Sequence, residues 1–186
     1  MLFLASESPR RRELLRAAGM EFSVCVPAGV EELRVSPSPR DLPMVNAERK
    51  AAAAAALHPD AWVLGADTVI VHENRVIGKP RDLDDAAAIL RRLSGTEHEV
   101  ITGMALLRCD RGFRDVWSET TRVRFRMLDD AVIARYLQLV PVLDKAGAYA
   151  VQEHGEMLID AVDGELENVI GLPLATLRKK LAALAL

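Results

Sequence analysis

Three arginines stand directly behind a serine–proline pair near the start of the chain, at residues 10–12. Ser8 as an N-cap and Pro9 at the first helical position predict a helix that begins there. Positive charge in a first helical turn opposes the helix dipole, whereas the free N–H groups at that end suit phosphate. The pattern indicates either an anion site or arginines that point to water or pair with Glu7 and Glu13.

A single aspartate interrupts the most apolar stretch of the chain. Asp67 lies within the strand-like run 62–71, next to the small residues Gly65 and Ala66. Burying a carboxylate is costly unless it is paired, bound to a metal or catalytic. Small neighbours let a ligand approach the backbone, so Asp67 is a candidate catalytic residue. The alternative is a structural aspartate held by backbone donors.

Acids and lysines elsewhere could complete such a site. Glu31 and Glu32 lie in a proline-rich loop, where paired acids either hold a divalent cation through oxygen or are solvated. Lys79 occupies a tight turn between Gly78 and Pro80, a rigid position for a point charge. Lys50 lies on an alanine-rich helix and is interpreted as either a surface residue or a ligand.

Residues 144–152 combine small side chains with an aromatic ring and an amide. Gly147 and its alanine neighbours leave room for a flat ligand. Tyr149 could support that ligand, and the amide of Gln152 could recognise the edge of a base. A buried strand that packs small residues is the alternative. The two cysteines and four histidines show no nucleophile or metal-ligand spacing, and we interpret them as structural.

The expected strands and helices must position these residues. Their order along the chain combines hairpins with helical crossovers, so we expect an α/β fold with a mixed sheet and flanking helices. Residues 1–186 have the length of one domain of ordinary size or of one domain with two lobes, and we treat them as a single domain. Periodicity, caps and turn residues predict the following elements. Strands are expected at 1–5, 22–26, 62–71, just after the turn 72–75, 99–109 and 114–127, and helices at 9–18, 41–57, 82–93, 129–139 and 172–184.

Composition excludes several classes of protein. The net charge of −3 argues against a nucleic-acid binder held by bulk electrostatics. No apolar run reaches the roughly 18 residues that a membrane span needs, and the apolar start is too short for a signal peptide. We therefore expect a cytoplasmic protein with no nucleic-acid or membrane partner.

Eight ordered motifs resemble the Maf family of nucleoside triphosphate pyrophosphatases along nearly the whole chain. They are LASESPRRREL at 4–14, VEE at 30–32, ERKA at 48–51, LGADTVI at 64–70, GKPRD at 78–82, LSGTEHEVITG at 93–103, DKAGAYAVQ at 144–152 and NVIGLPL at 168–174. The resemblance implies a fold similar to that of the inosine triphosphate pyrophosphatases, with an elongated mixed sheet and two lobes around a cleft. It also implies hydrolysis between the α- and β-phosphates, and a homodimer.

The resemblance also implies roles for single residues. Asp67 matches the family's proton acceptor. Mg²⁺ or Mn²⁺ would bridge Glu32, Asp67 and the triphosphate. The positions that match the handling of phosphate and metal are Ser8, Arg11, Glu32, Lys50 and Lys79.

Three positions indicate the subfamily that acts on dTTP and UTP: Arg10, Thr68 and Gln152. The alternatives are a 7-methyl-GTP pyrophosphatase and a non-catalytic nucleotide sensor that regulates cell division, since the family takes its name from an effect on septum formation. One departure exists. Glu165 and Leu166 follow Gly164 where the family usually has serine and an aromatic residue.

Overall fold

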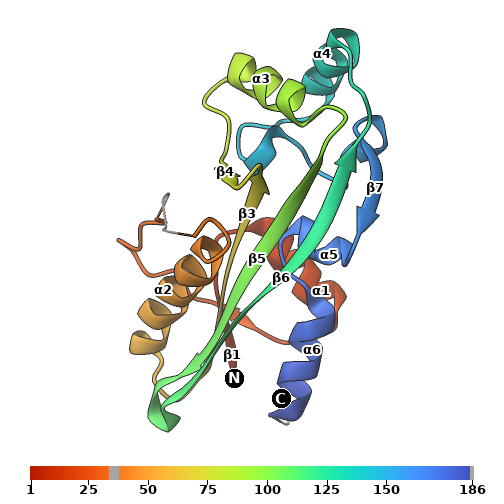
Figure 1. Cartoon of the computed structure of the whole chain (residues 1–186). Helices are drawn as coiled ribbons and strands as arrows, with labels where there is room; N and C mark the ends of the chain where they lie inside the picture. The colour runs from red at the N-terminus through yellow and green to blue at the C-terminus, as the bar shows by residue number, and fades with distance from the viewer. Residues whose placement is uncertain (34–37, 185–186) are drawn as a thin grey trace. The chain divides into compact units, whose positions relative to one another are not determined.

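A computed structural model of the chain describes residues 1–33 and 38–184 (Figure 1). Its strands form one seven-stranded sheet in the order β2-β1-β3-β5-β6-β7, and β4 pairs with β3 outside this path. The strands are β1 (Leu2–Ala5), β2 (Ser23–Val24), β3 (Trp62–His72), β4 (Arg75–Ile77), β5 (Glu97–Arg108), β6 (Phe113–Phe125) and β7 (Ile159–Asp163).

The sheet is mixed, as the sequence predicts. Strand β1 pairs in parallel with β2 and β3, whereas β4 runs antiparallel to β3, and β7 antiparallel to β6. The helices are α1 (Pro9–Ala17), α2 (Leu42–Leu57), α3 (Leu83–Leu93), α4 (Asp130–Leu139), α5 (Leu166–Ile170) and α6 (Leu174–Ala183). Three single 3₁₀ turns complete the list: η1 (Cys109–Arg111), η2 (Ala146–Ala148) and η3 (Gly155–Met157). The predicted α/β class is confirmed.

The chain divides into two compact units, and each is built from separate segments. Unit 1 comprises Met1–Thr68, Thr102–Glu119 and Gly171–Leu186, and unit 2 comprises Val69–Ile101 and Thr120–Ile170. The long strands β3, β5 and β6 therefore contribute residues to both units.

Unit 1 has a helix layer on each face of its strands (Figure 1). On one face Leu4, Leu64 and Met104 pack with residues of α1 and α6. On the other face Ala5 and Val63 pack with the buried alanines of α2. Since successive side chains of a strand point to opposite faces, this alternation decides which helix each site residue on β3 meets.

Unit 2 has its own core beneath α3 and α4. The apolar face of α3 (Ala86, Leu90 and Leu93) packs with Ile133 and Tyr136 of α4. Helices α3 and α4 begin where the sequence predicts. Asp82 caps α3, and Asp129 caps α4, each through its side chain.

Some predicted elements were wrong or incomplete. The strand considered as an alternative for residues 144–152 is not present, since they hold the turn η2 with Gly147 at φ 73°. Neither β7 nor α5 was predicted, and α6 begins two residues after the expected start at 172. Across the described residues, no helix combines the length and the apolar character that a membrane crossing requires.

Candidate active site

Strand β3 presents two neighbouring polar residues to opposite faces of unit 1. Asp67 shares the face of Val63 and Gly65 and meets α2, whereas Thr68 shares the face of Leu64 and meets α1. Two polar networks therefore start from adjacent positions of one strand. The first contains the carboxylates, and the second is centred on a buried arginine.

The first network, here called the carboxylate cluster, consists of Glu32, Asn46, Lys50 and Asp67. Lys50 Nζ donates to Glu32 Oε1 at 2.6 Å and to Asp67 Oδ1 at 2.9 Å. The Asp67 side chain is 9% exposed, that of Lys50 14% and that of Glu32 52%. The cluster thus runs from a buried carboxylate to one that faces solvent, with a cation between them.

A glycine on β3 lets α2 come close enough to form this cluster. A Cβ at Gly65 would lie 2.1 Å from the carbonyl oxygen of Ala47 and 2.9 Å from the backbone nitrogen of Ala51. The helix backbone therefore rests directly on the strand at Gly65. Asn46 and Lys50, which are one turn apart on α2, consequently reach Asp67 two residues further along the strand.

Arg11 is buried at the centre of the second network. Its Nε donates to Gly171 O at 2.9 Å, its Nη1 to Ser6 Oγ at 2.9 Å and its Nη2 to Thr68 Oγ1 at 3.0 Å. The Thr68 hydroxyl also shares a hydrogen bond of 2.9 Å with that of Thr102. These bonds use three N–H groups, and a guanidinium has others to offer an anion.

The positive charge of the Arg11 guanidinium suits it to bind such an anion. Burial lowers the pKa of its guanidinium, and the negative charges of Asp67 and Glu32 oppose that shift. Arginine stays protonated at any ordinary pH, so Arg11 is a permanent buried cation.

The start of α1 is capped as predicted. Ser8 is the N-cap, and its Oγ accepts from the backbone nitrogen of Arg11 at 3.5 Å. Arg12 donates to the main-chain carbonyl of Glu7 and not to its carboxylate. Arg10 is half-buried on the same turn. Of the three arginines, Arg11 alone is buried. The three residues therefore differ in exposure because they point in different directions from the first turn of α1.

Two predicted site residues belong to unit 2. Lys79 is exposed in the loop after β4, and Gln152 is exposed after η2. Unit 1 brings together Glu32, Lys50 and Asp67 in the carboxylate cluster, and Arg11 with Thr68 in the second network. The contributions of Lys79 and Gln152 stay predictions.

Tyr149 does not have the exposed role suggested by the sequence. It is buried, its hydroxyl lies 2.8 Å from His98 Nε2, and its ring meets the rings of His98 and Phe125 edge to face. Burial and the nearby His72 lower the pKa of His98 to about 4, and burial raises the pKa of Tyr149. We call His72, His98, Phe125 and Tyr149 the histidine–tyrosine cluster.

The carboxylate cluster could hold a divalent cation. Among the described residues, no group of three or more His, Cys, Asp or Glu side chains has a metal-binding arrangement. Two carboxylates already converge on one cation, the ammonium of Lys50. Mg²⁺ is commonly held by one or two carboxylates and completes its shell with water and substrate phosphates. Glu32 and Asp67 fit an ion of that kind and do not form a complete protein cage.

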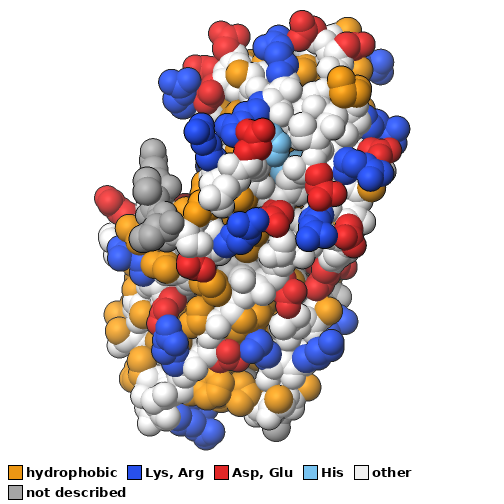
Figure 2. Space-filling model, in the orientation of Figure 1, with side chains coloured by type: hydrophobic (Ala, Val, Ile, Leu, Met, Phe, Trp, Pro, Cys, Tyr) orange, Lys and Arg blue, Asp and Glu red, His pale blue; other side chains and the backbone are white. Residues whose placement is uncertain are grey.

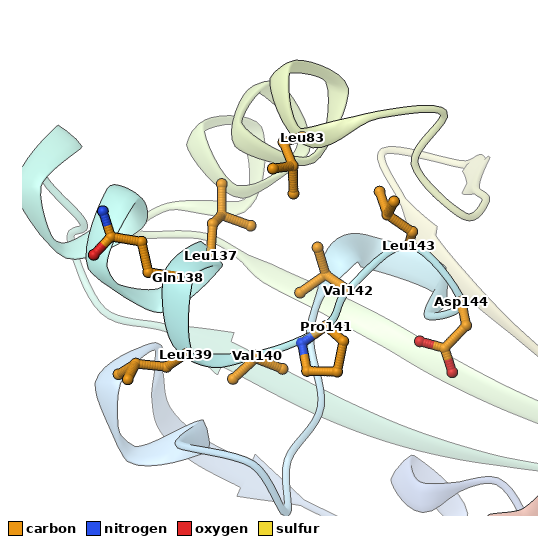
Figure 3. A pocket seen from close by; sticks show the side chains of 9 residues that line it. All are labelled: Leu83, Leu137, Gln138, Leu139, Val140, Pro141, Val142, Leu143 and Asp144. Carbon is orange, nitrogen blue, oxygen red and sulfur yellow. The ribbon is translucent and has the colours of Figure 1, made fainter.

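A cavity of about 620 Å³ lies elsewhere, in unit 2 (Figure 3). It is lined almost entirely by apolar side chains from α3, α4 and the segment after α4. The lining residues are Leu83, Leu137, Gln138, Leu139, Val140, Pro141, Val142, Leu143 and Asp144. None of the predicted site residues lines it. On the face shown in Figure 2, basic and acidic side chains are interspersed, and neither sign forms a continuous patch.

Sequence reasoning missed residues that the structure adds to the site. Asn46 is buried and bonded to Asp67, Ser6 and Gly171 accept hydrogen bonds from Arg11, and Thr102 bonds to Thr68. For Asn46 the available signal was its place one turn before Lys50 on the alanine-rich helix α2. For Ser6 and Gly171 the signal was their membership of two of the ordered motifs.

Comparisons with known proteins agree along the whole chain. A model of the family described as Maf-like protein matches residues 1–184. A dTTP/UTP pyrophosphatase of Akkermansia muciniphila is 45% identical over 183 residues, which are 98% of this chain and 96% of the relative. A dTTP/UTP pyrophosphatase of Pelotomaculum thermopropionicum is 46% identical over 177 residues, which are 95% of this chain and 92% of the relative.

Solved structures support the fold. The Ham1 protein of Staphylococcus aureus matches with a TM-score of 0.57 at 13% identity and covers 98% of both chains. A HAM1 protein of Coxiella burnetii matches with a TM-score of 0.51 at 12% identity, covering 96% of this chain and 98% of the other. At these identities the likeness concerns the path of the backbone alone.

Proposed function

The chain belongs to the Maf family, and on that premise we propose that it is a nucleoside triphosphate pyrophosphatase that hydrolyses dTTP and UTP to the monophosphate and pyrophosphate. The observation that carries this proposal is the carboxylate cluster. It places a buried aspartate on an apolar strand, 2.9 Å from a lysine ammonium that also holds Glu32. Relatives named for this activity match over nearly all of the chain.

In the proposed reaction Asp67 acts on water. The oxygen of a water molecule bonds to the α-phosphorus, the bond from that phosphorus to the bridging α–β oxygen breaks, and pyrophosphate leaves with the bridging oxygen. The proton of the water passes to Asp67, the general base. Lys50, Lys79, Ser8 and the remaining N–H groups of Arg11 hold the phosphates, so most of the rate enhancement comes from positioning and electrostatics.

Glu32 and Asp67 are the proposed ligands of Mg²⁺ or Mn²⁺. The cation supplies charge that offsets the negative charge of the phosphates in the transition state. Lys50, which joins the same two carboxylates, keeps the cluster compact.

Substrate choice is assigned to Arg10, Thr68 and Gln152. The Thr68 hydroxyl is engaged by Arg11 and Thr102, so a change at Thr68 would also alter the arginine's surroundings. Gln152 is exposed and Arg10 is half-buried, and we assign both to contacts with the base or sugar.

The test is an assay of pyrophosphate release across dTTP, UTP, CTP, GTP and 7-methyl-GTP, with Mg²⁺ or Mn²⁺ added. We expect the highest kcat/KM for dTTP and UTP. A preference for 7-methyl-GTP would replace the proposed substrate. Tight nucleotide binding without turnover would instead support the alternative of a regulator that senses nucleotides.

Arg10 and Arg11 should respond differently when substituted, because neighbouring helix positions point in different directions. Arg11→Lys keeps the charge and loses the bonds to Ser6, Thr68 and Gly171, so we expect kcat/KM to fall by similar factors for every substrate. Arg10→Trp should change the ratio, lowering dTTP and UTP relative to 7-methyl-GTP. A reversed pattern would mean that the two roles are exchanged.

Two further properties are part of the proposal. We infer a cytoplasmic location, since Cys25 and Cys109 are both free thiols, as is usual in a reducing compartment. We also infer a homodimer, which sedimentation at micromolar concentration would test. A single species of 20.4 kDa would contradict it.

A further inference from the structure

Asn46 uses its whole amide group inside the carboxylate cluster. The residue is 2% exposed. Its Nδ2 donates to Asp67 Oδ2 at 2.9 Å and to the carbonyl of Leu33 at 3.0 Å, and its Oδ1 accepts from the Leu33 backbone nitrogen at 2.8 Å. Because a carboxylate only accepts hydrogen bonds, the amide has one orientation that satisfies all three partners.

These bonds connect the catalytic strand to the loop that carries Glu32. Leu33 follows Glu32 directly, and residues 25–33 form no helix or strand. Leu33 is 40% exposed, so water could satisfy its backbone groups without Asn46. Holding both groups of Leu33 therefore does more than pair buried polar atoms. It places the loop.

The same amide orients Asp67. Asn46 and Lys50 lie four residues apart on α2 and so project from the same face of the helix. Asn46 binds Oδ2 of Asp67, and Lys50 binds Oδ1. With one donor on each oxygen the carboxylate cannot rotate freely, and Oδ1 is the oxygen that faces Lys50, which also bonds Glu32.

We propose that Asn46 is a positioning residue for the reaction: its amide fixes the plane of the Asp67 carboxylate and ties the Glu32 loop to it at Leu33. This inference rests on the proposed function for its kinetic consequence. Its structural part, the bridge between Leu33 and Asp67, is independent of any substrate.

Three variants separate positioning from general stability. Asn46→Leu keeps the branched shape of the side chain and removes all three bonds. Asn46→Asp keeps an acceptor for the Leu33 nitrogen but loses both donated bonds and adds a negative charge beside Asp67. Val45→Ala, an exposed position on the same turn of α2, is the matched control.

Steady-state kinetics with dTTP give the first readout. We expect Asn46→Leu to lower kcat by at least about 10-fold with KM changed by no more than roughly 3-fold, because a misplaced catalytic group costs rate more than binding. Asn46→Asp should lower kcat further, and Val45→Ala should match the wild type. All assays are run well below each variant's Tm, so that a loss of stability alone leaves kcat unchanged.

Hydrogen exchange at the Leu33 amide gives the second readout. We expect this amide to exchange slowly in the wild type and in Asn46→Asp, and rapidly in Asn46→Leu. Equal exchange in wild type and Asn46→Leu would disprove the bridge. Faster exchange with an unchanged kcat would reduce Asn46 to a loop anchor and overturn its positioning role. A wild type inactive toward every nucleotide would refute the proposed function instead, and Leu33 exchange would still decide whether the bridge exists.

Discussion

The carboxylate cluster of unit 1 and the histidine–tyrosine cluster of unit 2 both bury polar groups, and they do so in opposite ways. In the first, the side chains of Lys50 and Asp67 form an ion pair at 2.9 Å. In the second, burial and the nearby His72 lower the pKa of His98 to about 4, so this histidine is neutral at physiological pH. Buried charge is costly, and a protein keeps it where the charge has a use.

The hydrogen bonds of the two clusters differ in the same sense. Both oxygens of Asp67 have a donor from α2, whereas Nδ1 of His72 and Nδ1 of His98 have no partner among the described residues. A neutral imidazole tolerates one missing bond at a cost of about 1–3 kcal/mol, which is far less than an isolated charge would cost. We therefore assign chemistry to the first cluster and packing to the second.

The largest expected effect tests that assignment directly. Asp67→Asn should keep the fold, since Asn46 and β3 are unchanged, and lower kcat by ~10²-fold or more, as expected when a general base is removed. Pyrophosphate release from dTTP is the measurement, and circular dichroism is the control for folding. Turnover near that of the wild type would contradict the assignment of the chemistry to the carboxylate cluster.

Removing the ammonium of Lys50 from the carboxylate cluster should destabilise the protein and make its stability depend on added Mg²⁺. Lys50→Met removes the ammonium that bonds both Asp67 and Glu32, and we expect a loss of about 1–3 kcal/mol in the free energy of unfolding. Mg²⁺ should raise the Tm of this variant more than that of the wild type, because a bound ion replaces the ammonium. Arg49→Met, at an exposed position of the same helix, is the control. No added effect of Mg²⁺ would argue against Glu32 and Asp67 as metal ligands.

For the histidine–tyrosine cluster we expect an effect on the pH dependence of stability and none on the rate of hydrolysis. The pKa of His98 is about 4 in the folded protein and about 6.5 when unfolded, so the unfolded chain binds more protons between these values. The stability that comes from keeping His98 neutral is complete above about pH 6.5 and is lost as pH falls toward 4. His98→Gln removes this dependence. Between about pH 7.5 and pH 5 the wild type should lose about 2 kcal/mol more than the variant, measured by urea unfolding.

The smallest effect is expected at the partner of this histidine. Tyr149→Phe keeps the ring contacts with His98 and Phe125 and removes the hydroxyl that lies 2.8 Å from His98 Nε2. We expect a cost of about 1 kcal/mol in the free energy of unfolding and no change in kcat for dTTP. A large fall in kcat would show that the second cluster takes part in the reaction after all.

The sequence was informative where a signal is local. Ser8 with Pro9, and Asp82 and Asp129 at their helix starts, are capping residues that need no partner far away in the chain, and all three begin helices. Strand β7 and helix α5 have five residues each, too few for hydrophobic periodicity to be visible.

For the site, residue type predicted Asp67 as a buried carboxylate but could not identify its partners. Asn46 is 21 positions away in sequence, and only the close approach of α2 at Gly65 makes the two meet. Tyr149 shows the opposite error. A tyrosine among small residues suggests a ligand platform, yet tertiary packing buries it against His98. The metal and the roles of Lys79 and Gln152 stay predictions.

The bond between Arg11 and Gly171 also bears on the order in which the protein is made. It joins residues 160 positions apart, and unit 1 takes segments from the start, the middle and the end of the chain. Both segments of unit 2 leave the ribosome before Gly171 does. Although N-terminal parts usually fold first during synthesis, unit 1 can be complete only after its last segment has been made. A nascent chain that stalls before residue 171 would therefore expose α1 and its arginine, and quality-control proteases would recognise it as unfinished.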